Sequence, residues 1–421
     1  AAWRRMLGDV EGDGVPPVPP LLMVAVQAAG LALVLGVGWS LRIDNNRFTL
    51  HGLYRNRLVR GFLGAARPGR KPEPVTGFDE ADDVRLAEMV ERDGEGMPVP
   101  RRLFPVVNMA VNLTHSDNPQ WAERKALSFA ATPLHCGFYV PHPLLARVED
   151  ADRTYVPTRH FHHSAKNVGG HGIGLGTAMT VSGAAASPNA GYHSQAGTAF
   201  LMTLFNLRLG MWVPNPAKPA RREGLSPVEQ VRALGGDLLG QSGIDGRAIY
   251  LSDGGHFDNL GLYEMLRRGC LRIVVVDASQ DVGCGFEDLG RSVRQASIDL
   301  GVTVTIQTPQ IGPRGKDARL GDGKLRGFAV GTIDYPGAEG QPGPRGTLLY
   351  IKPSWLAGMP VEVAAYGAAE DAFPHQSTGD QWFSESQFEA YRRLGEFQLG
   401  VAAPGTAPGT ARAKGSTTSE F

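Results

Sequence analysis

An aspartate followed by two glycines, Asp253-Gly254-Gly255, is the part of this sequence best suited to chemistry. The apolar lead-in predicts a strand over 248–252, and residues 262–268 predict a helix after it. An acid at the end of a strand, followed by residues that tolerate any backbone conformation, presents a carboxylate at the rim of a sheet. Such a carboxylate can act as a general acid or base. The same triplet is also typical of a plain tight turn, and the motif alone leaves that alternative open.

The second acid at the end of a strand-like run is Asp277, which precedes the turn sequence Ala-Ser-Gln-Asp. Aspartate commonly caps such a turn by hydrogen bonding to its backbone. We therefore expect Asp277 to cap a turn and Asp253 to be the catalytic acid, with His256 at the rim of the site. Asn259 is expected to hold the loop through hydrogen bonds from its side chain to the backbone.

Two further groups of residues are candidate ligand-binding sites. His160, His162, His163 and His171 lie close in sequence, but adjacent histidines point apart in an extended segment, and no cysteine or carboxylate has ligand spacing nearby. The glycine-rich run 169–176 lacks the Lys-Ser/Thr of a phosphate loop and follows no clear strand. We expect loops at both places, and neither a metal nor an organic cofactor.

The elements that must position Asp253 follow from periodicity. Short β-branched runs predict strands at 104–113, 271–277 and 302–306, and the spacing of apolar residues predicts helices at 198–210 and 286–300. A hairpin is expected from 327–334 and 346–352. The order strand, helix, strand predicts an α/β fold with a parallel sheet covered by helices on both faces. We expect 104–352 to form one layered structure, with 248–252 and 271–277 in the same sheet.

Near the N-terminus, residues 21–39 are apolar except for Gln27, which is long enough to cross a hydrocarbon core of about 30 Å. Basic residues cluster after this run, so the positive-inside rule predicts that the bulk of the chain lies on the cytoplasmic side of a membrane. We therefore expect an N-terminal segment, 1–41, with a transmembrane helix at 21–39. The alternatives are a signal peptide, which the long pre-segment and flanking prolines disfavour, and a buried core helix.

Composition narrows the classes of function. Lys plus Arg and Asp plus Glu balance at 42 each in 421 residues, so no global charge indicates nucleic acid as a partner. The three cysteines are widely spaced and odd in number, which favours a reducing compartment. The Ala/Pro/Gly/Thr-rich stretch 396–421 predicts a disordered tail.

Several segments resemble one family of enzymes. Asp253-Gly254-Gly255 resembles the Asp-Gly-Gly element of the patatin and cytosolic phospholipase A2 superfamily, and 181–192 is similar to the small-residue segment that precedes this aspartate in patatin-like lipases. Residues 128–137 are similar to the Thr-Pro-x-x-x-Gly segment of the lysophospholipase branch. Two more segments, 46–58 and 373–388, look like parts of large bacterial patatin-like membrane proteins.

The resemblance covers about residues 40–395 and implies a patatin-like layered α/β domain over 42–395. It also implies a lipid acyl hydrolase that uses a Ser-Asp dyad on membrane phospholipid or lysophospholipid esters. In such a dyad Asp253 accepts the proton of a serine and returns it to the leaving alcohol. Gly254 and Gly255 then let the backbone approach the substrate closely. We expect Asp253 at the mouth of a cleft lined in part by 181–192.

The nucleophile of this family sits in a Gly-x-Ser-x-Gly motif, which is absent from the sequence. The run Gly240-Gln241-Ser242-Gly243-Ile244 fails at its last position. Two accounts stay open: the chain lacks an N-terminal part that carries the serine and the oxyanion hole, or the protein has kept the fold without catalysis. They correspond to a membrane-associated lipid acyl hydrolase and to a non-catalytic, membrane-attached lipid-binding or scaffold protein.

Overall fold

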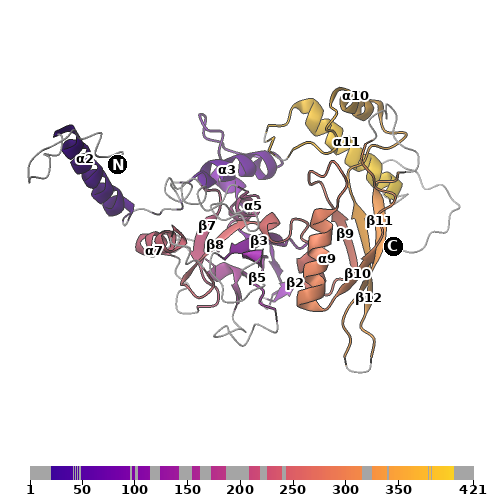
Figure 1. Cartoon of the computed structure of the whole chain (residues 1–421), viewed down its shortest axis with the longest axis horizontal. Coiled ribbons are helices and arrows are strands. Elements are labelled where there is room, and N and C mark those ends of the chain that lie inside the picture. Colours follow the sequence, from indigo (N-terminus) through magenta and orange to yellow (C-terminus); the bar gives the residue numbers. More distant parts are fainter. Residues whose placement is uncertain are drawn as a thin grey trace, which may run out of the picture.

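The computed structural model forms two sheets and the helices around them, with one further helix standing apart (Figure 1). It describes residues 20–40, 42, 44, 46, 49–94, 97–99, 103–113, 124–141, 154–161, 172–185, 208–218, 225–238, 243–314, 325–338, 341–377, 379–380 and 382–402. Of the helix predicted at 198–210, only the last three residues are described. His162, His163 and His171 also lie outside the described residues.

The first sheet has six strands in the order β6-β5-β4-β3-β8-β7, and every neighbouring pair is antiparallel. The predicted strand at 104–113 is confirmed as β3, and the strand that leads to the aspartate is confirmed as β8. The prediction of a parallel sheet is wrong here. The strands of this sheet are β3 (Val107–Asn112), β4 (Ala126–Ala131), β5 (His135–Phe138), β6 (Tyr155–Pro157), β7 (Met211–Pro214) and β8 (Ala248–Asp253).

The second sheet has four strands in the order β10-β11-β12-β9, and only its β12–β9 pair is parallel. The predicted strands at 271–277 and 302–306 and the predicted hairpin are confirmed. The strands are β9 (Arg272–Val276), β10 (Thr303–Ile306), β11 (Phe328–Asp334) and β12 (Arg345–Ile351).

The expectation that 248–252 and 271–277 share a sheet is wrong, because β8 and β9 belong to different sheets. The helix between them, α8 (Leu262–Arg267), has only 6 residues. At 1.5 Å per residue it is about 9 Å long, whereas a strand of β8's length spans about 20 Å. The helix is therefore too short to return the chain along β8, and β9 begins a second layer.

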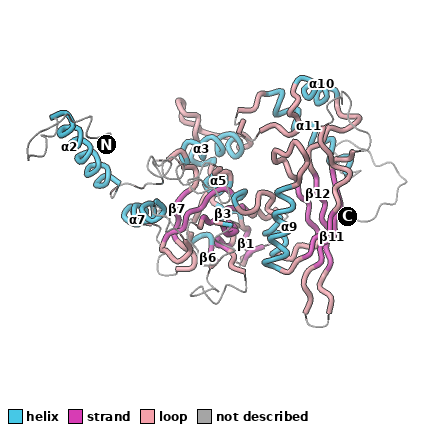
Figure 2. Tube along the Cα trace, viewed as in Figure 1, coloured by secondary structure: helices cyan, strands magenta, loops and turns pink. Residues whose placement is uncertain are grey.

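Helix α9 (Glu287–Leu300) lies between the two sheets (Figure 2), and α8 packs against it. Their apolar side chains form one core with Ala110 and Ala126 of the first sheet and with Ile273, Val275, Leu348 and Tyr350 of the second. The opposite face of the first sheet packs against α5 (Leu175–Ser182) in a separate core. The chain is thus a mixed α/β protein in which the first sheet has helices on both faces.

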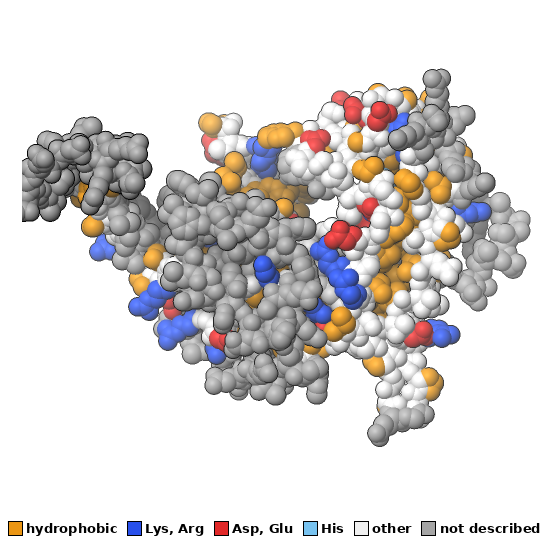
Figure 3. Space-filling model, in the orientation of Figure 1, with side chains coloured by type: hydrophobic (Ala, Val, Ile, Leu, Met, Phe, Trp, Pro, Cys, Tyr) orange, Lys and Arg blue, Asp and Glu red, His pale blue; other side chains and the backbone are white. Residues whose placement is uncertain are grey.

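The second sheet departs from that expectation, since several described side chains on its other face are exposed. Val274 and Val276 of β9 and Val330 of β11 are exposed there. Figure 3 shows a stripe of hydrophobic side chains along this sheet. The registers place these residues on the side opposite to the shared core, because neighbouring residues of a strand point to opposite faces.

The helix predicted near the N-terminus is confirmed as α2 (Pro20–Ser40), which projects from the body (Figure 1). Its apolar side chains Leu22, Met23, Val24, Val26, Leu31, Val34 and Leu35 are exposed. The predicted membrane span is not found, because no helix in the described part of the chain is both long enough and apolar enough to cross a bilayer.

The C-terminal helix α11 (Glu385–Ala402) corrects the expected start of the tail. Residues 396–402 are helical, because Gln398 is buried and donates a hydrogen bond to the Lys352 carbonyl at 3.0 Å. The rest of the expected tail, 403–421, lies outside the described residues. The remaining helices and short strands are α3 (His51–Leu58), which continues as a π-helix (Val59–Gly64), α7 (Pro227–Leu238), α10 (Val361–Ala369), β1 (Glu91–Arg92), β2 (Pro98–Val99) and 3-10 turns at Glu80–Asp82, Leu86–Met89, Thr158–His160 and Gly254–His256.

Candidate active site at the end of strand β8

Asp253 is the last residue of β8 and pairs with Met109 of the neighbouring strand β3. Its Oδ1 accepts a hydrogen bond from the Gly255 backbone N–H at 2.7 Å. No hydrogen-bond partner for its Oδ2 is found among the described residues. Burial raises the pKa of the carboxyl above its usual value, and the hydrogen bond from Gly255 only partly offsets this. The carboxylate is therefore oriented by one oxygen and free to accept a proton on the other.

The two glycines after Asp253 are required by close contacts. A Cβ at Gly254 would lie 2.8 Å from the Asn108 carbonyl oxygen, and one at Gly255 would lie 2.8 Å from Oδ1 of Asn259 and 3.1 Å from Oδ1 of Asp253. The glycines thus let this turn pack directly against β3 and against its own side chains. Asp253-Gly254-Gly255 can therefore be a tight turn and part of a site at once, because the turn fixes the position of the carboxylate.

Replacing Gly254 with alanine is expected to lower the free energy of unfolding by about 1–3 kcal/mol, because the new methyl group overpacks against backbone. Urea unfolding of the variant measures this loss. Gly283→Ala is the matched control, since a Cβ there meets nothing within 4 Å. Equal midpoints for the two variants would contradict the close contact at Gly254.

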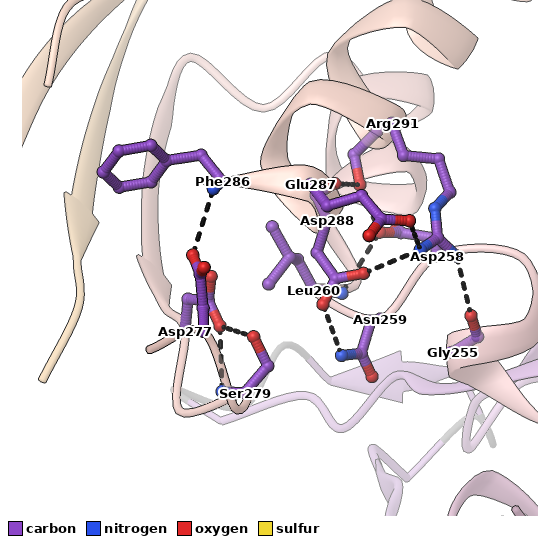
Figure 4. Close-up of polar contacts among 12 residues, drawn as sticks. Gly255, Asp258, Asn259, Leu260, Asp277, Ser279, Phe286, Glu287, Asp288 and Arg291 are labelled. Atoms are coloured by element: carbon purple, nitrogen blue, oxygen red, sulfur yellow. Dashed lines mark hydrogen bonds and ion pairs between the residues drawn. The ribbon is translucent and has the colours of Figure 1, made fainter. Parts of the chain in front are cut away.

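The loop after the glycines is tied to α9. Asp258 is buried and accepts hydrogen bonds from the backbone N–H of Leu260 and Tyr263 and from the Ser292 hydroxyl, at 3.2, 2.8 and 2.7 Å. Figure 4 shows Arg291 of α9 reaching the Gly255 carbonyl, where its Nη1 donates a hydrogen bond at 3.3 Å. Helix α9 thereby holds the turn that carries the carboxylate.

Asn259 is structural as expected, but through a different contact. Its side-chain amide donates to the Asp288 carboxylate of α9 at 2.7 Å, whereas a hydrogen bond to backbone was expected. Asp258, which sequence reasoning missed, makes the backbone contacts instead. Its hydrogen bond from the Tyr263 backbone N–H, in the first turn of α8, resembles the contact that a capping aspartate makes.

Three residues from distant elements, Tyr54, Asn108 and Ser182, lie near this turn and were not predicted. The Tyr54 hydroxyl of α3 lies 2.8 Å from where a Gly183 Cβ would be, at the C-terminal end of α5. Burial and the charge of Asp253 raise the pKa of Tyr54, so its hydroxyl is neutral at pH 7. Ser182 Oγ donates to the Asn108 carbonyl at 2.7 Å. The one signal in the sequence is that Tyr54 and Ser182 lie in two of the family-like segments.

Only the start of the segment 181–192 is described, and it lies beside the turn at Gly254. This agrees with the expected neighbourhood of the aspartate. Residues 186–192 lie outside the described part of the chain, and the cleft that they were expected to line stays a prediction.

His256 contacts Ser252, with 2.8 Å between its Nδ1 and the serine Oγ. Such a pair resembles a nucleophile and its base. However, Ser252 is 0% exposed, and its hydroxyl lies 2.5 Å from Oδ1 of Asn112. Because successive residues of a strand face opposite sides, Ser252 also points away from Asp253. The pair is therefore structural, and His256 lies beside the buried serine.

Asp277 caps its turn as predicted. Its Oδ1 accepts from the Ser279 backbone N–H at 2.9 Å and from the Ser279 hydroxyl at 2.6 Å. Its Oδ2 accepts from the Tyr350 hydroxyl at 2.5 Å and from Lys352 Nζ at 3.0 Å. Burial alone would raise the pKa of this carboxyl, but these donors and the lysine charge lower it below its usual value. Both oxygens are occupied, so Asp277 is a poor candidate for a base.

His160, the described member of the predicted histidine cluster, ends a 3-10 turn. Among the described residues, no group of three or more His, Cys, Asp and Glu side chains has the arrangement of a metal site. The glycine-rich run is described from Gly172, and its last residues begin α5 with Leu175.

Comparison with known proteins adds no assignment, since neither a family model, nor a curated protein, nor a solved structure matches this chain.

Proposed function

We propose that this chain is the aspartate-bearing part of a lipid acyl hydrolase with a patatin-like fold, in which Asp253 is the general base of a Ser-Asp dyad. The observation that supports this is the state of its carboxylate. One oxygen is held by Gly255, the other has no partner among the described residues, and burial raises the pKa of the group. A general base must be fixed in place and still able to accept a proton, and this carboxylate meets both conditions.

The reaction follows from that role. Asp253 takes the proton from a serine hydroxyl as the serine oxygen attacks the ester carbonyl carbon. The proton then passes to the leaving alcohol as the ester bond breaks, which leaves an acyl-serine. Water, deprotonated by the same carboxylate, releases the fatty acid and restores the serine. The serine must come from outside this sequence, because no Gly-x-Ser-x-Gly occurs within it.

The substrates that we propose are membrane phospholipid or lysophospholipid esters, acted on by a membrane-associated protein whose main body is cytoplasmic. The neutral Tyr54 hydroxyl near Asp253 supports an ester substrate, because it offers a hydrogen-bond donor without a competing charge.

The second candidate is a non-catalytic lipid-binding or scaffold protein of the same fold. The missing nucleophile motif favours it. So does the engagement of Ser182, the last residue of α5, whose hydroxyl already donates to the Asn108 carbonyl.

Two measurements on the protein expressed from its complete natural gene separate these candidates. The first is fatty-acid release from phosphatidylcholine and lysophosphatidylcholine, and the second is labelling by a serine-reactive fluorophosphonate. We expect hydrolysis, and a labelled serine outside the 421 residues, while the 421-residue chain alone is inactive and unlabelled. Hydrolysis by that chain alone would contradict an external serine. Absence of both hydrolysis and label in the complete protein would favour the lipid-binding candidate.

A further inference from the structure

A pocket of about 380 Å³ lies at the end of β8 opposite to Asp253. Its lining includes Trp212 of β7, Ala248 at the start of β8, and Ala233 and Gly236 of α7. Ala248 and Asp253 are the first and last residues of β8, five steps or about 17 Å apart at about 3.4 Å per residue. The pocket is therefore distinct from the candidate active site, and its size is that of small-molecule sites in general.

The walls of this pocket are held in place by hydrogen bonds. The side chain of Asn46 donates to the Trp212 carbonyl at 2.9 Å and accepts from its backbone N–H at 3.1 Å, as a neighbouring strand would. Gln230 of α7 donates to Asp44 at 2.9 Å. The side chain of Asn215 donates to the carbonyls of Ile244 and Gly246, at 2.6 and 2.8 Å, which fixes the loop that precedes β8. A site built in this way loses little conformational freedom when a ligand binds.

The charges around the pocket favour an anion. Arg232 and Arg247 line it together with one carboxylate, Glu229, so the formal balance is one positive charge. Oε2 of Glu229 already accepts from the backbone and hydroxyl of Ser226, at 3.0 and 2.9 Å, in the capping of α7. Its other oxygen lies 3.8 Å from Arg247, whose side chain is exposed, so this pair is weak. Arg232 has no hydrogen-bond or ion-pair partner within the described residues, and a guanidinium group can bind two phosphate oxygens at once.

The interior of the pocket is apolar. Trp212 is 2% exposed, and its ring lies 5.2 Å from that of Tyr250. Its indole N–H is buried without a hydrogen-bond partner in the described part of the chain, which native proteins rarely leave uncompensated. Ala233 and Ala248 complete a surface suited to hydrocarbon. Helix α7 also contacts α2, whose exposed side chains are apolar. Figure 3 shows basic side chains on this flank of the body.

We propose that this pocket binds a phosphate group that is attached to an apolar body, with Arg232 and Arg247 on the phosphate and Trp212 against the apolar part. The phosphate of a lipid headgroup and free phosphate share the first contact, and only the former makes the second. This site does not depend on catalysis at Asp253.

Isothermal titration calorimetry of the 421-residue chain tests the site with two probes, inorganic phosphate and the dihexyl-ether analogue of phosphatidic acid, which has no carboxylic ester for an acyl hydrolase to cleave. We expect the ether lipid to bind at least ten-fold more tightly than inorganic phosphate. Equal affinities, or tighter binding of inorganic phosphate, would overturn the role of the apolar part. Absence of binding by both would overturn the site.

Two pairs of variants locate the binding. Arg232→Gln with Arg247→Gln is expected to weaken ether-lipid binding at least ten-fold, whereas Arg272→Gln, which removes an exposed charge on β9, leaves it unchanged. Gly236→Val should fill the pocket, and Gly235→Val is its matched control in α7. A Cβ at either glycine meets nothing within 4 Å, and Gly235 does not line the pocket. Equal loss of binding in the two glycine variants, with unchanged melting temperatures, would contradict the location.

Discussion

Replacing Asp253 with asparagine in the complete protein is expected to lower the rate of ester hydrolysis by about 10²–10⁴-fold, the usual contribution of a general base. The amide keeps the shape of the side chain and the hydrogen bond from Gly255, but it cannot accept the serine proton. Substrate binding should change little, so the loss should appear in kcat rather than in KM. The measurement is initial-rate kinetics on a soluble lysophospholipid.

The pH dependence gives a second readout of the same group. Burial raises the pKa of Asp253, and a base works only when it is deprotonated. The rate should therefore rise with pH through a pKa above the usual aspartate value of about 3.9. This acidic limb should be absent from the residual activity of Asp253→Asn.

Asp371→Asn is the control for the loss of one carboxylate, since that residue is exposed in the turn after α10. It should keep full activity. Full activity of Asp253→Asn would show that another group is the base. Asp277 would then be next in line from the sequence, although Lys352, Tyr350 and Ser279 already occupy its oxygens.

The local structure around the site follows from the sequence. The strand that ends at Asp253, the helix α9 and the strands β9 and β10 all form where periodicity predicts them. Each of these is decided within about 15 residues, by apolar spacing and by glycines such as Gly301, whose φ of 65° ends α9. The sharp turn after Asp253 is likewise decided locally, by Gly254 and Gly255.

The arrangement of these elements could not be predicted in the same way. Whether β8 and β9 share a sheet depends on the length of α8 and on the pairing of β9 with β12, more than 70 residues further along the chain. The residues around the turn also come from far away, because Tyr54 and Asn108 precede Asp253 by more than 140 residues. Such contacts follow from long-range packing, which a single sequence read in local windows does not contain.

The role of Lys352 could not be predicted from the sequence either, because a lysine just after a strand is usually solvated. It is 0% exposed and lies 3.0 Å from Asp277 and 3.5 Å from Asp281. It follows β12 directly, as Asp277 follows β9, so the two residues end neighbouring parallel strands. The pair thus joins the two strands at one edge of the second sheet.

Replacing Lys352 with methionine is expected to lower the free energy of unfolding by about 3–5 kcal/mol, the cost of leaving a buried charge without its partner. Methionine keeps most of the side-chain volume, so the loss reports on charge rather than on a cavity. The measurement is urea unfolding followed by circular dichroism. Lys71→Met, at an exposed position, should change the free energy of unfolding by less than about 0.5 kcal/mol.

The double variant Asp277→Asn with Lys352→Met separates charge from packing. Asparagine removes the stranded charge, and its one side-chain oxygen can still accept the hydrogen bonds from Ser279 while its NH2 group faces the Tyr350 hydroxyl, which can accept. Because neighbouring residues are not additive, the double variant should be more stable than Lys352→Met alone. A double variant that is less stable than either single variant would show that the two residues stabilise the sheet independently. The lysine would then not be the counter-charge that keeps Asp277 ionised and bound in its cap.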